Sequence, residues 1–303
     1  MLVTGATGFV GQGIIPVLRA AGYRVRAALR TPQPVPDGVE SAILGDLTRM
    51  MNRRSAFEDV DFVVHCAGLA HATTTIPDET YRRVNTEATF ELGRTAASVG
   101  VKRFVFLSSV RAQTGPVSRE VVTEALMPSP TDAYGRSKLE AEQALAKSGV
   151  NHVVLRPVLV HGTGMRFNMA ALLALAQTPW PLPFGLCRAK RSIVAREHLA
   201  DAVLLALRND AMAGHTYLVA DPQPLGLNEM VAGMRAGFGR SPGLLPVPPA
   251  MLAVGARLAG RAEVIERLNG QLIADPAKLL AAGWKPRRGS RDALAETARA
   301  MSA

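Results

Sequence analysis

The stretch Thr4-Gly5-Ala6-Thr7-Gly8-Phe9-Val10-Gly11 decides the fold, because its glycines turn a buried strand into a helix. Gly5 and Gly8 allow the backbone to approach a pyrophosphate closely, and Gly11 allows the helix to pack tightly on the strand. The amides at the helix N-terminus would face the phosphates, where the helix dipole favours negative charge. This G-x-x-G-x-x-G spacing predicts a dinucleotide site, with an ordinary tight turn as the alternative reading.

Short apolar runs alternate with helical patterns through the first half of the chain. We expect strands near the N-terminus and at residues 23–29, 41–44, 62–66, 104–107 and 152–155. Helices are expected between several of them, at residues 81–98 and 133–147. This alternation predicts an α/β fold, a Rossmann-type doubly wound parallel sheet that binds ligands at the carboxyl ends of its strands.

The pattern loosens after Pro157, where prolines cluster and helical segments dominate. We therefore expect two domains. Residues 1–156 would form an NAD(P)-binding Rossmann domain. Residues 157–303 would form a smaller, mostly helical substrate-binding lobe, interleaved with the Rossmann sheet.

Composition and charge narrow the class of protein. The chain has 303 residues, 48% of them hydrophobic, enough for a real core. Its net charge of +10 would attract nucleic acid, a membrane surface or a phosphorylated small molecule. The basic residues are scattered with few aromatics among them, which argues against a nucleic-acid partner. We see no leader segment and no apolar run of membrane-spanning length, so we expect a cytoplasmic protein without a membrane partner.

Polar residues after the expected strands are candidates for cofactor binding. Arg30 stands about 20 residues beyond the glycine turn, where an acidic residue would bind the ribose 2′-hydroxyl of NAD. A guanidinium suits a 2′-phosphate, which favours NADP over NAD, although a solvated arginine is nearly as good a reading. Asp46 and Leu47 would contact the adenine, unless Asp46 only caps a helix. Ala67-Gly68 offers another close backbone approach, and Asn85 would make a structural or a functional hydrogen bond.

The histidines and cysteines show no metal-binding pattern. His65, within a strand, reads as a hydrogen-bonded core histidine, whereas His71 lies in a threonine-rich loop where it could face substrate. Cys66 and Cys187 have no metal or redox spacing and read as reduced, buried residues. We therefore expect no metal site.

The sharpest chemical signal is Tyr134-Gly135-Arg136-Ser137-Lys138, together with Ser109 after a strand. Tyr134 and Lys138 are four residues apart on a helix and share one face. A free phenol has a pKa of about 10, and lowering it by three units takes about 4 kcal/mol, which a nearby ammonium in a dry cleft can supply. Tyr134 would then exchange a proton with a substrate oxygen that Ser109 holds. The alternative is that the tyrosine and the lysine are merely neighbours on a helix.

These motifs together resemble the extended short-chain dehydrogenase/reductases, in the branch of NAD-dependent epimerases and dehydratases. The resemblance rests on Thr4 to Gly11, Asp46-Leu47, Ala67-Gly68, Asn85, Ser109, the Tyr134/Lys138 pair and Arg156-Pro157. It implies that Tyr134 is the general acid and base, that Lys138 binds the nicotinamide ribose and tunes Tyr134, and that Ser109 orients the reacting oxygen. Pro157, with Arg156, would place the nicotinamide edge.

The second lobe looks similar to bacterial sugar-nucleotide 4-epimerases and 4-ketoreductases. The matching residues include Gly162-Thr163-Gly164, Asn168, Arg191-Ser192 and residues 268–272. The resemblance makes Asn168 and Arg191 candidates for the substrate diphosphate and implies a nucleotide-sugar substrate and a homodimer. His161 stands where many relatives have tyrosine, so we expect it near the substrate. A reductase of a steroid- or flavonoid-like carbonyl, or a non-catalytic NAD(P)-binding regulator, remains the alternative.

Overall fold

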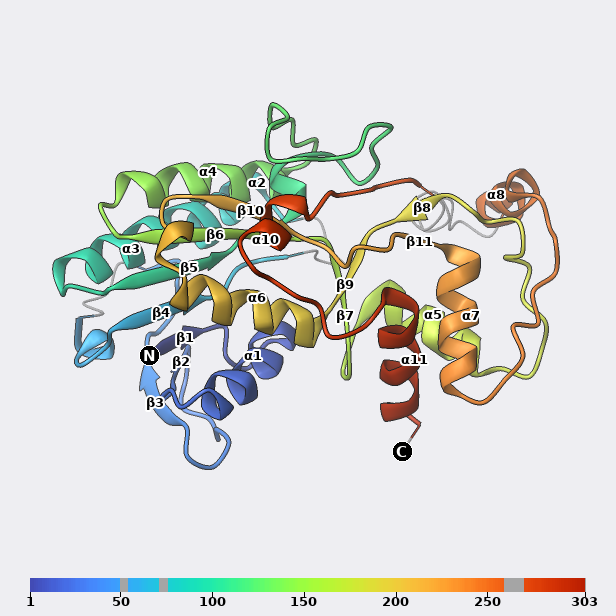
Figure 1. Ribbon diagram of the computed structural model, residues 1–303. Coiled ribbons are helices and arrows are strands. Elements are labelled where there is room, and N and C mark those ends of the chain that lie inside the picture. Colours follow the sequence, from blue (N-terminus) through green and yellow to red (C-terminus); the bar gives the residue numbers. More distant parts are fainter. Residues whose placement is uncertain (50–53, 71–75, 259–269, 303) are drawn as a thin grey trace.

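The central sheet of the computed structural model has seven parallel strands, as expected for this α/β class (Figure 1). The structure describes residues 1–49, 54–70, 76–258 and 270–302. In spatial order the strands are β10 (Thr216–Val219), β6 (His152–Pro157), β5 (Arg103–Leu107), β4 (Phe62–His65), β1 (Leu2–Thr4), β2 (Arg26–Leu29) and β3 (Glu40–Ile43). The strands expected from the apolar runs are all present.

Two helical layers cover the sheet (Figure 1). On one face, α1 (Phe9–Ala20) packs beside α6 (Arg196–Arg208), and their apolar side chains, such as Leu18 and Leu199, join one core cluster. The other face carries α3 (Ala88–Ser98) and α4 (Ala133–Lys147), which bury Leu92 and Leu145 against Phe104 of β5. Because both faces are covered, the inner strands β1, β4 and β5 are buried and mostly apolar rather than alternating, whereas the edge strand β3 is largely exposed.

The helix expected over residues 81–98 forms in three parts. A short α2 (Asp78–Tyr81) runs into a π-helical segment, η2 (Arg82–Glu87), before α3 begins at Ala88. A π-helical turn widens the backbone by one residue and is often found at functional sites. In this chain it contains Asn85, whose buried side chain reaches a neighbouring loop.

The second lobe is mostly helical, with its own core. Its strands pair as β7 (Leu159–His161) with β9 (Ile193–Ala195) and β8 (Lys190–Arg191) with β11 (Leu225–Gly226). Its helices are α5 (Phe167–Gln177), α7 (Leu227–Gly237), α8 (Pro249–Leu258) and α11 (Ser290–Ala300), whereas α10 (Ala277–Ala281) packs against β10 of the main sheet. Between them the chain returns to the main sheet as α6 and β10, so the second half of the sequence contributes to both lobes.

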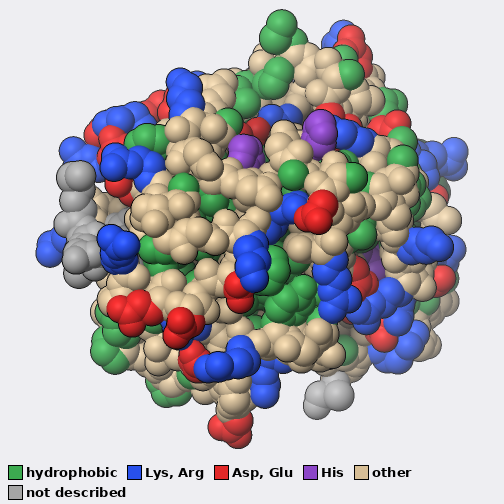
Figure 2. All heavy atoms as spheres, turned by 60° about the vertical axis from the view of Figure 1, so that its left-hand side comes forward, with side chains coloured by type: hydrophobic (Ala, Val, Ile, Leu, Met, Phe, Trp, Pro, Cys, Tyr) green, Lys and Arg blue, Asp and Glu red, His purple; other side chains and the backbone are tan. Residues whose placement is uncertain are grey.

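The surface mixes charges of both signs. Figure 2 shows lysine and arginine side chains lying among acidic ones on one face of the molecule. Exposed ion pairs such as Arg24–Glu40 and Lys102–Asp61 are part of this pattern. Within the described ranges, no helix combines the length and the apolar character needed to cross a membrane.

Candidate functional site

The glycine turn lies where the order of the strands reverses. β1 has β2 on one side and β4 on the other, so the loops after β1 and β4 diverge at the topological switch point, where open α/β sheets bind ligands. Gly5 has φ +64°, and a Cβ there would lie 2.7 Å from the Ala67 amide nitrogen. A Cβ on Gly11 would lie 2.2 Å from the Gly5 carbonyl oxygen. Only glycine fits these two positions, as a dinucleotide cradle requires.

Helix α1 begins at this turn with an uncapped N-terminus. Gly8 is the N-cap and makes no side-chain capping bond, so the first amides of α1 are available to an anion. Arg196, at the start of α6, stacks on the Phe9 ring at 5.2 Å and donates to the Phe9 carbonyl at 3.2 Å. Gly13 leaves room for the arginine stem, because a Cβ there would meet Arg196 Cδ at 2.4 Å. The sequence did not lead us to expect Arg196 at this site. Gly13, a glycine inside a helix, is the feature of the sequence that points to a close neighbour there.

Asn85 organises the loop after β4. Its Oδ1 accepts from the Leu69 amide at 2.8 Å, and its Nδ2 donates to the Leu69 carbonyl at 3.0 Å and to Ser137 Oγ at 2.9 Å. These bonds tie η2, the loop and α4 together. A Cβ on Gly68 would lie 2.9 Å from Asn85 Oδ1 and 3.6 Å from Lys138 Nζ. We expected Asn85 to make either a structural or a functional hydrogen bond, and the bonds seen here are structural.

Ser109, Tyr134 and Lys138 converge at the carboxyl end of β5. Asp132 caps α4 by accepting from the Gly135 amide at 2.7 Å, which sets Tyr134 in the first turn. Tyr134 is hydrogen-bonded to Ser109, the second residue after β5. Ser109 is the N-cap of η3 (Val110–Ala112), which packs on α4. Lys138 Nζ donates to the Leu107 carbonyl at 2.7 Å and lies 4.4 Å from the centre of the Phe106 ring.

The electrostatics of this group differ from the expected lowering of the phenol pKa. Burial raises the pKa of Tyr134, and the hydrogen bond with Ser109 and the charge of Arg111 oppose that rise only in part. Burial lowers the pKa of Lys138 to about 8, although the nearby Glu142 carboxylate raises it. In the free protein, therefore, Tyr134 is a protonated phenol, and Lys138 is poised near neutral pH.

Arg30 and Asp46 lie at the ends of neighbouring strands. Arg30 is exposed directly after β2. Asp46 Oδ1 accepts from the amide and the hydroxyl of Thr48, both at 2.9 Å, and these bonds are the main reason why the pKa of Asp46 is lowered. The charge of Arg30 contributes to the same lowering, so the two side chains are near each other. Asp46 caps a turn rather than a helix.

The candidate substrate residues are spread over the second lobe. Arg191, on β8, donates to the carbonyls of Pro116 at 2.9 Å and Gly270 at 3.1 Å, and burial lowers its pKa to about 10, with a further contribution from Arg111. Its buried Nε has no hydrogen-bond partner within the described residues. Asn168 is exposed at the start of α5. His71 lies outside the described residues.

The structure also places three other residues discussed from the sequence, namely His65, Cys66 and Cys187. His65 is buried, with Nδ1 2.6 Å from Thr4 Oγ1 and Nε2 3.0 Å from Thr89 Oγ1, which confirms the core reading. Cys66 and Cys187 are free thiols. In the part of the chain that the structure describes, no three His, Cys, Asp or Glu side chains are grouped as a metal site would need.

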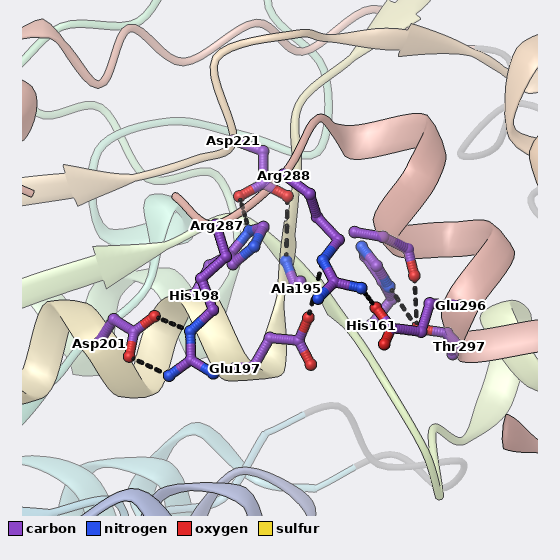
Figure 3. A network of polar contacts seen from close by, with 11 residues as sticks. His161, Ala195, Glu197, His198, Asp201, Asp221, Arg287, Arg288, Glu296 and Thr297 are labelled. Atoms are coloured by element: carbon purple, nitrogen blue, oxygen red, sulfur yellow. Dashed lines mark hydrogen bonds and ion pairs between the residues drawn. The ribbon is translucent and has the colours of Figure 1, made fainter. Parts of the chain in front are cut away.

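A network of polar contacts lies where the second lobe joins the sheet (Figure 3). Asp221, after β10, accepts from the Ala195 amide at 3.2 Å and lies 2.8 Å from Nδ1 of His198 on α6, with both side chains fully buried. His161 belongs to the same junction, where its Nδ1 lies 3.3 Å from Thr297 Oγ1 of α11. Against the expectation of a place near the substrate, the His161 side chain is buried in this junction.

Comparison with known proteins agrees with the fold and the motifs. Residues 1–220 match the model of the "NAD dependent epimerase/dehydratase family". The chain is 33% identical to a UDP-glucose 4-epimerase of Vibrio cholerae, over 99% of this chain and 95% of that protein. It is 26% identical to a ceramide reductase of Caulobacter vibrioides, over 94% and 85% of the two chains.

Solved structures show the same fold at low sequence identity. The UDP-N-acetylglucosamine 4-epimerase from Bacillus cereus superposes with a TM-score of 0.79 at 20% identity, covering 100% of this chain and 99% of that one. MoeE5 in complex with UDP-glucose and NAD superposes with a TM-score of 0.75 at 22% identity, covering 99% and 98%. With its family model matched over most of the sequence, the chain belongs to the NAD-dependent epimerase/dehydratase family.

Proposed function

We propose that this protein is an NAD-dependent epimerase that acts at C4 of a nucleotide-activated sugar. The observation that carries the proposal is the meeting of Ser109, Tyr134 and Lys138 at the same sheet edge as the glycine turn. The similarity to a UDP-glucose 4-epimerase over nearly the whole length supports this substrate class.

The residues present fit a dinucleotide. Gly5, Gly8 and Gly11 would cradle the pyrophosphate against the N-terminus of α1, since a Cβ at either end of this turn would strike backbone. Asp46 and Leu47 would lie toward the adenine, and Ala67, Gly68 and Pro157 along the path to the nicotinamide. Once bound, the nicotinamide supplies a hydride acceptor and donor at the sugar carbon.

Side chains of the protein would transfer the proton. Tyr134 would accept the proton of the C4 hydroxyl as the sugar is oxidised and return it to the same oxygen when hydride comes back to the other face. Ser109, already bonded to Tyr134, would hold that oxygen. Lys138 would lend positive charge to the phenolate and hydrogen-bond the nicotinamide ribose. Because burial raises the pKa of Tyr134 in the free protein, this charge is needed for turnover near neutral pH.

Arg191 is our candidate for the substrate diphosphate. It is a half-buried cation that donates to the carbonyl oxygens of Pro116 and Gly270, and its pKa is lowered by burial and by Arg111. No carboxylate among the described residues pairs with Arg191, and a partly buried cation of this kind gains from a bound phosphate. Arg191→Gln should raise KM for a UDP-sugar about 10- to 100-fold, the loss expected for a charged hydrogen bond, with a smaller effect on kcat.

The direct test uses the purified protein with UDP-glucose or UDP-galactose and no added cofactor. Interconversion of the two sugars, followed by NMR, with no net change in nicotinamide absorbance is the expected result. Tyr134→Phe is the control that should lose it. No isomer exchange with any UDP- or dTDP-linked sugar would overturn the proposal and direct attention to other carbonyl substrates.

A net reductase that uses NADP is the second candidate, favoured by the exposed Arg30 after β2. It would consume NADPH in proportion to a 4-keto sugar instead of exchanging isomers. The cofactor that copurifies separates the two, because tightly held NAD favours the epimerase and exchangeable NADP favours the reductase.

A further inference from the structure

The hydrogen bond of Ser108 extends the pattern of contacts between β5 and α4. Its neighbours at positions 107 and 109 are bound to Lys138 and Tyr134. Ser108 Oγ donates to Oε1 of Glu142, one helical turn beyond Lys138. Thus three consecutive residues at the end of the strand are each tied to one stripe of α4, at positions 134, 138 and 142.

Glu142 is paired on its other side with an arginine of β6. Arg156 Nε donates to Glu142 Oε1 at 2.9 Å and Nη2 to Oε2 at 2.5 Å, a bidentate ion pair. Glu142 is 7% exposed and Arg156 5%, so the pair is shielded from water. The remaining Nη1 of Arg156 donates to Gln113, whose Nε2 donates to the Leu126 carbonyl at 2.5 Å. Arg156 therefore points into the core between β5, β6 and α4.

Removing these two charges from water costs free energy, so we ask what the buried ion pair contributes. Replacing a buried ion pair by apolar residues is often neutral or stabilising, so such a pair is weak evidence for a role in stability alone. This pair joins α4, which carries Lys138, to β6, which ends at Pro157, and the bond of Ser108 to Glu142 adds the segment that follows β5. It also places a negative charge one helical turn from Lys138.

We propose that Glu142, held by Arg156, is a positioning residue of the catalytic set. Its charge holds the ammonium form of Lys138, and its bond to Ser108 holds Ser109 against Tyr134. This inference rests on the proposed function, since it assigns Glu142 to the same site.

Among the groups around Lys138, Glu142 has the strongest influence on the charge of the lysine. Directly after β4 it faces Cys66, whose thiol has its pKa raised to about 12 by burial and is neutral at physiological pH. On α4 it has Tyr134, a protonated phenol, and Glu142. From β5 it meets only the Phe106 ring and the Leu107 carbonyl. Arg156 of β6 lies behind Glu142. Glu142 is therefore the principal anion acting on Lys138 at neutral pH.

The charge of Lys138 can be followed without any activity measurement. The chain has six lysines, so lysine labelled with ¹³C at Cε gives few NMR signals, and the signal missing in Lys138→Arg assigns this one. We expect it to titrate near pH 8 in the native protein and at clearly lower pH in Glu142→Gln. Glu142→Asp keeps the charge and should restore most of the native titration.

Arg103→Gln is the matched control, since it removes a different buried arginine, which begins β5 and is paired with Asp210 at the end of that strand opposite to Ser108. It should lower stability and leave the Lys138 signal in place. If Glu142→Gln does not fold, the double variant Glu142→Gln/Arg156→Met removes the charge without leaving an unpaired arginine and should show the same displaced titration. An unchanged Lys138 titration in the folded variant would overturn the proposal.

Turnover supplies the second readout. With UDP-glucose, Glu142→Gln should lower kcat about 10- to 100-fold, move the alkaline limb of its pH profile to lower pH, and leave KM nearly unchanged. Ser108→Ala should lower kcat without moving that limb. A uniform loss with the native pH profile in Glu142→Gln would mean a merely structural role. If the native protein turns over no sugar nucleotide, the proposed function fails, while the Lys138 titration still decides the charge.

Discussion

The proposed reaction depends on the phenolic oxygen of Tyr134. Tyr134→Phe removes the hydroxyl that bonds Ser109 and keeps the ring, which packs 6.4 Å from the ring of Tyr81. We expect kcat to fall about 10²- to 10⁴-fold, the usual contribution of a positioned acid and base. Affinity for NAD, measured by calorimetry, should stay unchanged. A variant that keeps native turnover would remove Tyr134 from the mechanism.

Arg30 tests the choice of cofactor at one exposed position. Arg30→Asp replaces the cation after β2 by the acidic type of residue that binds a ribose 2′-hydroxyl. We expect Kd for NADP to rise roughly 10- to 100-fold, as for the loss of a charged hydrogen bond, and Kd for NAD to stay level or fall. Equal changes for both dinucleotides would show that Arg30 is only a solvated side chain.

The turn between β1 and α1 tests the cradle at the scale of an element. In Gly11→Ala the new Cβ would lie 2.2 Å from the Gly5 carbonyl oxygen, so the turn must move away from its neighbours. We expect the free energy of unfolding to fall by about 1–3 kcal/mol and NAD binding to weaken. Urea denaturation and an NAD titration measure the two effects.

Gly255 in α8 gives the control for this substitution. Within the described residues a Cβ there meets open space, so Gly255→Ala should leave NAD binding unchanged and stability equal or slightly higher. If both alanine variants bound NAD like the native protein, the glycine turn would not be the cofactor cradle.

The junction between the lobes gives the whole molecule a dependence on pH. Burial, followed by the charge of His198, lowers the pKa of His161 from 6.5 to about 3. The unfolded chain therefore takes up a proton at His161 between pH 6.5 and 3, and the folded protein does not. The stability linked to this group is present above pH 6.5 and is lost as the pH falls toward 3.

We expect His161→Phe to make the decline in stability shallower by up to about 1.4 kcal/mol per pH unit between pH 6 and 4. Urea denaturation of both proteins at several pH values measures the two slopes. Identical slopes would mean that His161 takes up its proton in the folded protein as well.

Local patterns in the sequence predicted the sheet, the glycine turn and the spacing of Tyr134 and Lys138. Runs of apolar residues identify strands because parallel strands are covered on both faces, as β4 and β5 are here. A four-residue separation places two side chains on one face of a helix whatever surrounds it. These features follow from backbone geometry and need no knowledge of distant contacts.

Tertiary structure alone decided which distant groups share an environment. Arg196 stacks on Phe9, 187 residues earlier in the chain, and Arg156 turns from the expected nicotinamide edge to Glu142 in the core. His161 joins α11 instead of the substrate region for the same reason. Spacing along the chain sets the face on which a side chain lies, but its partner and its exposure to water depend on how the elements pack, and these determine its charge and its role.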